Sequence, residues 1–308
     1  YLGNTVPVMH ACGHDSHMAM LLGAAKVLSE LKPQLNGSVV FLFQPAEEGP
    51  PGDEEGGAPL MIKEGAMDNP KVDAVFGIHI SSELDLGSIY YKPGAFMASS
   101  DWFTIKVNGR QSHGASPWNA VDPVVVSAEI IAGLQTIVSR QMDLPQAPVV
   151  ITVGKIQAGV RPNIIPETAT MEGTIRTLDP EMQKQVHERM RRMATQIAAA
   201  HGATADVMID TKTLVTVNDP ALVSASLASL QKAAGKDKVK PIHWTTGAED
   251  FSFYGLKAPA FFFNVGARDP QLSPENATHH HTPGFQINDS KLDVGVKAFC
   301  QLVLDYKK

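Results

Sequence analysis

The middle of the chain contains a succession of strand and helix patterns whose order limits the fold strongly. Strand, helix, strand, strand, helix, strand is the order of the split βαβ sandwich, a ferredoxin-like arrangement. We therefore expect a self-contained ferredoxin-like domain over residues 99–212. The patterns are "DWFTIKVNG" (101–109), a helix at 120–142, "PVVITVGKIQAG" (148–159), "TATMEGTIRT" (168–177), a helix at 179–201 and "ADVMIDT" (205–211).

The segments on either side of this domain contain short apolar runs rich in Val, Ile and Phe. They are "SVVFLF" (38–43), "DAVFGIHI" (73–80) and "APAFFFNV" (258–265). Continuous apolar runs of this length are typical of strands that are buried on both faces of a sheet covered by helices. These runs predict the strands of a second sheet, which the insertion interrupts.

Helical patterns accompany these strands. Apolar residues recur at helical spacing from Ser16 to Leu31, with Asp15 or Ser16 placed to cap the first turn, and a closing helix is expected at 290–306. Strands that alternate with helices predict an α/β domain. We expect this domain to consist of residues 1–98 and 213–308.

The composition fits one large domain or two modest ones and excludes some partners. The chain has 308 residues, of which 44% are hydrophobic, enough to form real cores. A net charge of -6, a pI near 6.0 and the lack of Lys/Arg clusters argue against nucleic acid and membrane surfaces as partners. No run approaches the ~18 uninterrupted apolar residues of a membrane span. We expect a soluble protein.

The start of the chain leaves the compartment open. Tyr1 is not an initiator Met, and no charged and then apolar leader follows it. N-terminal sequence is therefore expected to be missing, and an export signal could be missing with it. We favour the cytoplasm, with a periplasmic or secreted location as the alternative.

The most reactive stretch of the chain is "MHACGHD" (9–15), directly before the first predicted helix. Cys12 and His14 lie two residues apart, which turns both side chains to one side of an extended segment. Thiolate and imidazole are strong ligands for zinc and similar divalent ions. Taken alone, the pair also fits a core thiol beside a capping histidine.

Further ligand types follow other predicted strands. Glu47 and Glu48 follow "VVFLFQPA", His79 ends "AVFGIH", and His281 lies in the "HHHTPGF" loop after "AFFFNV". In open α/β sheets, ligands gather beyond the carboxyl ends of the strands. Each residue alone could be a core histidine or a loop acid, but together they favour a metal site. His280 stays open as the alternative to His281.

These candidate ligands outnumber the four that one tetrahedral zinc ion binds. Two metal ions that share a bridging ligand, as in aminopeptidases and phosphatases, would bind five of these residues and leave Glu47 as a proton carrier. A bridging thiolate is chemically reasonable because coordination deprotonates the thiol. We expect Zn²⁺ or Mn²⁺, with Co²⁺ or Ni²⁺ possible. The expected ligands are Cys12, His14, Glu48, His79 and His281.

The motifs together resemble a known family. The chain is similar to the amidohydrolase branch of the M20 metallopeptidases, which includes hippurate hydrolases, N-acyl-amino-acid deacylases and plant auxin-conjugate hydrolases. The resemblance covers essentially the whole chain and implies a dinuclear, aminopeptidase-like catalytic domain with an inserted ferredoxin-like lid. The motifs, in order, are "MHACGHD", "QPAEEG", "GIHI", "NGRQSHGASP", "RPNIIPETA", "EGTIRT", "GAEDFS" and "HTPGF".

The resemblance also implies roles for single residues. Glu47 matches the general base, and His113 matches a histidine that stabilises the oxyanion. Asn163 and Arg176 match groups that bind the substrate near its carboxylate. Without the family, His113 would be an exposed turn residue and Arg176 a surface charge. The residues that match the family's metal ligands are Cys12, His14, Glu48, His79 and His281.

The implied activity is metal-dependent hydrolysis of the amide bond of N-acyl amino acids. A metallo-carboxypeptidase or dipeptidase with the same metals is the first alternative, and a binding protein of the same fold without turnover is the second. The resemblance implies a homodimer formed through the lid, in which His113 reaches the neighbouring protomer's metals. It also implies further residues before "MHACGHD", including a strand with an Asp-rich motif that supports the metals.

Overall fold

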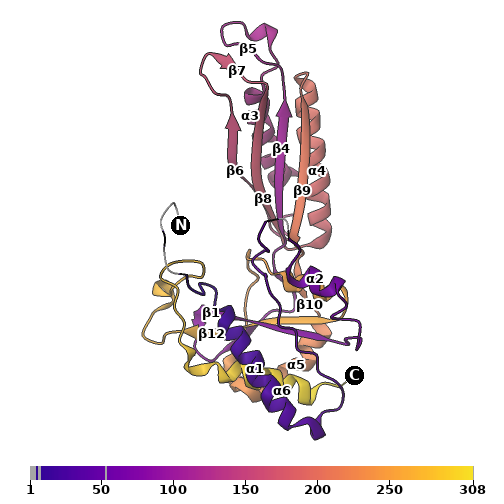
Figure 1. Ribbon diagram of the computed structural model, residues 1–308, viewed down its shortest axis with the longest axis vertical. Coiled ribbons are helices and arrows are strands. Elements are labelled where there is room, and N and C mark those ends of the chain that lie inside the picture. The colour runs from indigo at the N-terminus through magenta and orange to yellow at the C-terminus, as the bar shows by residue number, and fades with distance from the viewer. Residues whose placement is uncertain (1–4, 6–7, 53, 308) are drawn as a thin grey trace. The chain divides into compact units, whose positions relative to one another are not determined.

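The computed structural model describes residue 5, residues 8–52 and residues 54–307, and its chain forms two compact units (Figure 1). The chain crosses the boundary between the units in β3 (Gly94–Met97) and β10 (Thr216–Asn218), which pair with each other, and again after His243 and after Ser252. The first unit comprises Tyr1–Phe96, Val217–His243 and Phe253–Lys308, and the second comprises Met97–Thr216 and Trp244–Ser252.

A mixed sheet forms the centre of the first unit. Its strand order is β1-β12-β2-β11, with β1 parallel to β12 and β12 antiparallel to β2. The apolar run "AFFFNV" lies in β12, where Phe261 and Phe263 are fully buried, as expected for a strand covered on both faces. The bounds are β1 (Val75–Asp85), β2 (Ile89–Tyr91), β11 (Val239–Pro241) and β12 (Ala260–Arg268).

Helices with buried apolar faces accompany this sheet. The helix α1 packs closely against α6, and a Cβ atom added at Gly295 would lie only 2.1 Å from the sulfur of Met20. A Cβ atom at Gly23 would lie 2.9 Å from Val296. Glycine at both positions allows the two helices to approach each other closely. The helices are α1 (His14–Glu30), α2 (Gly57–Lys63), α5 (Pro220–Ala234) and α6 (Asp293–Asp305).

The structure corrects three local predictions in this unit. Residues 38–43 form no strand, because no neighbouring strand within the described parts of the chain supplies the backbone hydrogen bonds that a ladder requires. Glu47 and Glu48 therefore follow a loop. The strand β1 continues to Asp85, so His79 lies inside it and not at its end. Gly13 occupies the N-cap position of α1, and no side chain of the described residues caps this helix.

The second unit follows the predicted element order. Its sheet order is β6-β8-β4-β9, with antiparallel pairing throughout, and α3 and α4 pack on one face. Asp122 and Asp179 cap these helices by accepting backbone N–H bonds, and a proline follows each of them. The bounds are β4 (Ser100–Asn108), α3 (Pro123–Gln141), β6 (Val149–Ala158), β8 (Thr168–Thr177), α4 (Pro180–Ala200) and β9 (Thr204–Thr213).

One helix of this unit has the length and composition of a membrane span. Pro123–Gln141 has a mean hydropathy of 1.2. Its buried residues, including Ile130, Leu134 and Ile137, face the sheet of the second unit. A helix that packs in this way belongs to the helical layer of an α/β sandwich.

Candidate metal centre

The turn before α1 brings the "ACGH" residues against β1. Gly13 has φ +83°, and a Cβ atom there would lie 2.4 Å from the Cγ2 atom of Ile80. The carbonyl oxygen of Gly13 accepts hydrogen bonds from the backbone nitrogen of Ser16 (3.0 Å) and from its hydroxyl group (2.5 Å). Glycine is therefore required between Cys12 and His14, both for the left-handed backbone and for the close approach to the strand.

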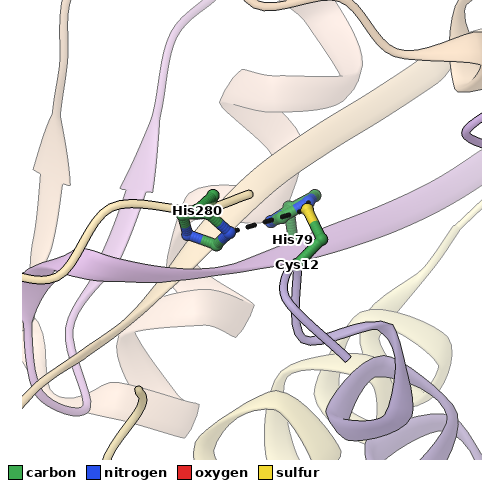
Figure 2. Close-up of side chains that lie close together, drawn as sticks. All are labelled: Cys12, His79 and His280. Carbon is green, nitrogen blue, oxygen red and sulfur yellow. Dashed lines mark hydrogen bonds between the residues drawn. The ribbon is translucent and has the colours of Figure 1, made fainter. Parts of the chain in front are cut away.

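Cys12 lies between two histidines that come from distant parts of the chain (Figure 2). Its Sγ atom is 3.4 Å from Nε2 of His79 and 3.5 Å from Nδ1 of His280. The backbone nitrogen of His281 donates to the carbonyl oxygen of Ala11 at 2.8 Å. This bond fixes the histidine loop to the segment that carries the thiol.

The hydrogen bonds of His79 determine its tautomer. Nδ1 lies 2.5 Å from the carbonyl oxygen of Ile80, a contact that requires a proton on Nδ1. Burial lowers the pKa of His79 to about 3, so the ring is neutral and Nε2 carries a free lone pair. A neutral imidazole with its distal N–H bound to a carbonyl is the usual arrangement of a metal-ligating histidine.

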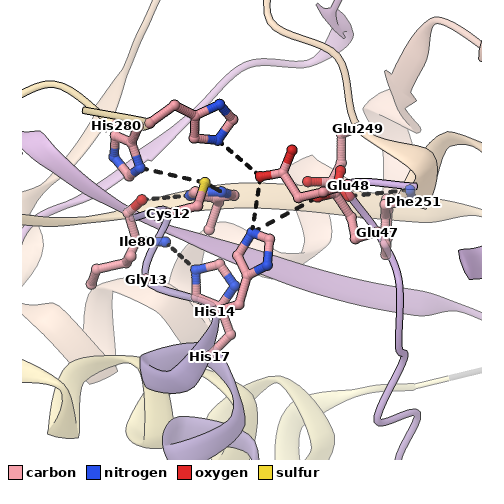
Figure 3. A network of polar contacts seen from close by, with 12 residues as sticks. Cys12, Gly13, His14, His17, Glu47, Glu48, Ile80, Glu249, Phe251 and His280 are labelled. Atoms are coloured by element: carbon pink, nitrogen blue, oxygen red, sulfur yellow. Dashed lines mark hydrogen bonds and ion pairs between the residues drawn. The ribbon is translucent and has the colours of Figure 1, made fainter. Parts of the chain in front are cut away.

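His17 is a neighbour that the sequence analysis did not assign. Its Nε2 atom accepts the backbone N–H of Ile80 at 2.8 Å, and burial lowers its pKa well below the ordinary value (Figure 3). Its ring centroid is 4.6 Å from that of His79. His17 thus positions the strand segment behind His79. His17 lies one helical turn after His14, and this spacing was the feature of the sequence that could have indicated its place beside the centre.

The carboxylates lie on the other side of Cys12. Nε2 of His14 is 3.8 Å from Glu47 and 3.9 Å from Glu48 (Figure 3). Nε2 of His281 is 2.8 Å from the same Oε1 atom of Glu48. Burial lowers the pKa of His14, and the charge of Glu48 partly opposes this shift. His14, Glu48 and His281 line an open pocket of about 330 Å³ together with Cys12.

The donor atoms fit a pair of metal ions. Cys12, His79 and His280 offer ligand atoms within 4.8 Å of one another, and so do Cys12, His14 and Glu48. Sulfur, imidazole nitrogen and carboxylate oxygen are the ligand types of zinc and related ions. The thiol belongs to both groups, which suits a ligand shared by two ions.

Two left-handed residues flank this cluster. Ala46 (φ 58°) precedes the glutamate pair, and His281 (φ 60°) lies in the histidine loop. They are the non-glycine residues with positive φ in the described part of the chain. Such residues cost about 1–3 kcal/mol each and are concentrated at functional sites.

The remaining predicted residues lie in the second unit, at its two ends. Ile164 of β7 (Ile164–Ile165) pairs with His113 of β5 (Ser112–His113), and the nitrogen of Gly114 donates to the carbonyl oxygen of Asn163 at 2.8 Å. His113 and Asn163 are therefore neighbours. Nδ1 of His113 accepts the backbone N–H of Ala115 at 3.0 Å, so the ring's other nitrogen carries the proton of the neutral form.

Arg176 is not part of this pair. It lies near the end of β8 that is farther from the β5–β7 strand pair, roughly 27 Å from Thr168 at ~3.4 Å per residue. Its Nη1 atom is buried and has no hydrogen-bond partner among the described residues. Burial lowers the pKa of the guanidinium, and the charge of Asp101 opposes this shift.

We expect the substitution Gly13→Ala to lower the stability of the protein by more than the cost of a left-handed alanine, and to weaken metal binding. Gly202 is a matched control, because its φ is +72° and no atom lies within 4 Å of an added Cβ. Gly202→Ala should cost about 1–2 kcal/mol, the penalty of a left-handed residue. Gly13→Ala should destabilise more, because its methyl group overlaps Ile80, and should lower metal affinity. Urea unfolding and metal titration of both variants test this, and equal losses would contradict it.

Comparisons with known proteins show the family of this chain. The sequence profile of "Peptidase family M20/M25/M40" matches residues 3–305. Thermostable carboxypeptidase 2 of Saccharolobus solfataricus is 37% identical over 97% of this chain and 74% of its own length. The N-acetylcysteine deacetylase of Bacillus subtilis is 36% identical over 96% of this chain and 73% of its own length.

A solved structure shares the fold. The Bacillus subtilis YXEP protein, described as a dinuclear metal binding peptidase from the M20 family, is 34% identical. It superposes with a TM-score of 0.77 over 96% of this chain and 72% of that chain. The match to the family over nearly the whole sequence, with relatives above 30% identity, confirms the resemblance that the motifs predict: this chain belongs to peptidase family M20/M25/M40.

Proposed function

We propose that this chain hydrolyses the amide bond of N-acyl amino acids with two divalent metal ions, Zn²⁺ or Mn²⁺ in the first place and Co²⁺ or Ni²⁺ as substitutes. Membership of the M20 family makes it a metal-dependent hydrolase. The observation that carries the proposal is the position of Cys12, whose sulfur lies 3.4 Å from Nε2 of His79 and also shares a ligand group with His14 and Glu48. The deacetylase among its relatives supports an N-acyl amino acid as the substrate.

The ions would bind between the turn before α1, the glutamate pair, β1 and the histidine loop. When bound, they polarise the scissile carbonyl and lower the pKa of the attacking water. His281 is preferred to His280 as the ligand because its Nε2 atom already lies beside an oxygen of Glu48. The proposed ligands are Cys12, His14, Glu48, His79 and His281.

Glu47 is the proposed general base and acid. Its carboxylate lies 3.8 Å from His14 and belongs to neither ligand group around Cys12. It would take a proton from water as the oxygen adds to the carbonyl carbon. It would then deliver that proton to the nitrogen as the C–N bond breaks, which yields a carboxylic acid and a free amino acid.

The second unit would provide the substrate contacts. The N–H of His113 would donate to the oxyanion, a contact often worth ~2.7–4 kcal/mol. Asn163 would bind the substrate beside it. Arg176 would receive the substrate carboxylate on its planar fork, and the lack of a hydrogen-bond partner for its Nη1 atom among the described residues supports this role.

We propose that the working form is a homodimer assembled through the second unit, which serves as the lid. His113 and Asn163 lie at one end of this unit and Arg176 at the other. The part of β8 from Thr168 to Arg176 alone spans roughly 27 Å at ~3.4 Å per residue, which exceeds the length of a small N-acyl amino acid. A second copy of the chain would therefore deliver His113 and Asn163 to a site whose Arg176 belongs to the first copy.

Metal removal tests the function. Chelator-treated protein should lose hydrolysis of N-acetyl and N-benzoyl amino acids and recover it with Zn²⁺ or Mn²⁺, because water activation requires the ions. Release of the free amino acid measures the reaction. Full activity of metal-free protein would refute the proposal. Faster cleavage of dipeptides would favour the metallo-carboxypeptidase or dipeptidase alternative, which the carboxypeptidase among its relatives supports. Metal binding without turnover of any substrate would favour a binding protein.

A further inference from the structure

His280 lies in the metal centre but differs from the other histidines there. Its Nε2 atom accepts the backbone N–H of Ser82 at 3.3 Å. An imidazole nitrogen that accepts a hydrogen bond carries no proton, so the proton of the neutral ring is on Nδ1. That Nδ1 atom lies 3.5 Å from the sulfur of Cys12. His280 therefore directs an N–H group at Cys12, whose sulfur lies within hydrogen-bond distance and whose backbone also forms a hydrogen bond with the ring.

His79 faces the same sulfur atom with the opposite character. Its Nδ1–H is bound to the carbonyl oxygen of Ile80, and its unprotonated Nε2 atom is 3.4 Å from Sγ. A metal ion can bind the lone pair of His79 and the thiolate together. It cannot bind Nδ1 of His280 unless that nitrogen loses its proton and Ser82 loses its acceptor.

The surroundings of His280 fix its ring in this orientation. Ser82 donates through its hydroxyl group to the carbonyl oxygen of Thr278 at 2.5 Å, which ties β1 to the loop just before His280. The ring of Phe285 lies 4.8 Å from the imidazole, centroid to centroid. The bond from the nitrogen of His281 to Ala11 holds the other side of the loop.

We propose that His280 is a positioning residue, which donates a hydrogen bond to the Cys12 thiolate and is not itself a metal ligand. The inference rests on the metal centre of the proposed function. A donor at the sulfur stabilises its negative charge and orients its remaining lone pairs, as outer hydrogen bonds do for other metal ligands. The adjacent histidines then have separate tasks, with His281 directed at Glu48 and His280 at Cys12.

Cobalt substitution of the full chain tests the assignment through metal content and the thiolate-to-cobalt charge-transfer band. His280→Leu removes the donor, and His280→Asn places an amide N–H near the position of Nδ1. His279→Leu is the matched control, because His279 is an exposed neighbour that pairs with Glu83. His281→Leu removes the proposed ligand.

His280→Leu should keep the wild-type cobalt content and shift the band to lower energy, because the sulfur lone pairs lose their stabilising donor. His280→Asn should return the band toward its wild-type position, and His279→Leu should leave it there. Loss of a cobalt ion in His280→Leu would show that His280 is a ligand, and an unshifted band would show that it makes no bond to the sulfur.

If His280→Leu does not fold, a wild-type-like band and cobalt content in His280→Asn support the proposal, and loss of cobalt in that variant refutes it. Failure of the wild type to bind cobalt would instead refute the metal centre itself.

Discussion

Glu47→Gln should retain both metal ions and lose roughly 10²–10⁴-fold in kcat, the usual contribution of a positioned general acid–base group. The amide has nearly the shape of the carboxylate but cannot take a proton from water. Glu47 also lies outside the two ligand groups that share Cys12, so its neutralisation leaves those donor atoms in place. Metal analysis and steady-state kinetics of the same preparation measure both effects.

Glu48 is the matched control for this experiment. It is the next residue in the chain, and its Oε1 atom lies near His14 and His281. Glu48→Gln should therefore lose metal as well as activity, and added metal should restore part of both. Equal metal loss in the two variants would contradict the division of roles, and loss of metal from Glu47→Gln alone would reverse it.

The pattern of the second unit was predictable because its signals are local. The run "TATMEGTIRT" predicts β8 to the residue, and the helices expected at 120–142 and 179–201 correspond to α3 and α4. Strand alternation, helical spacing and caps are properties of short segments. The sequence therefore contains most of the information that specifies these elements.

The first unit was harder to predict, because the conformation of some of its segments depends on residues that are distant in the sequence. The run at 38–43 has the composition of a buried strand, but pairing requires a neighbour that the run itself cannot specify. The left-handed turn at Gly13 likewise depends on Ile80, which is distant in the sequence. Only the fold brings these residues together.

The candidate site shows the same limit at the level of atoms. Residue types and motifs place Cys12, His79 and the histidine loop in one centre. They do not specify tautomers, which depend on the backbone groups of Ile80 and Ser82. The choice between His280 and His281 stays open in the sequence for this reason. The separation of Arg176 from His113 also becomes apparent only once β5, which carries His113, is seen to pair with β7, just before the start of β8.

Two inactive variants, Glu47→Gln and His113→Ala, should restore activity when their subunits are mixed. In a mixed dimer with shared sites, the site on the His113→Ala chain keeps its own Glu47 and borrows an intact histidine from its partner. Random pairing makes half of the dimers mixed, with one good site in each, so roughly a quarter of wild-type activity should return. Glu47→Gln mixed with Asn163→Ala should recover activity to the same extent, because Asn163 neighbours His113 beside the β5–β7 strand pair.

The mixture of His113→Ala with Asn163→Ala separates this arrangement from its alternatives. Suppose that the partner delivers both residues together. Each site of this mixed dimer then receives a partner segment in which either His113 or Asn163 is replaced by alanine. No site is complete, so activity should stay at the level of the single variants. Recovery in this mixture would show that His113 and Asn163 act on different sites. If His113 serves its own chain, the Glu47→Gln and His113→Ala mixture stays inactive although sedimentation shows that subunits exchanged. That result would refute the shared site and leave the metal centre unaffected, because its proposed ligands come from the first unit alone.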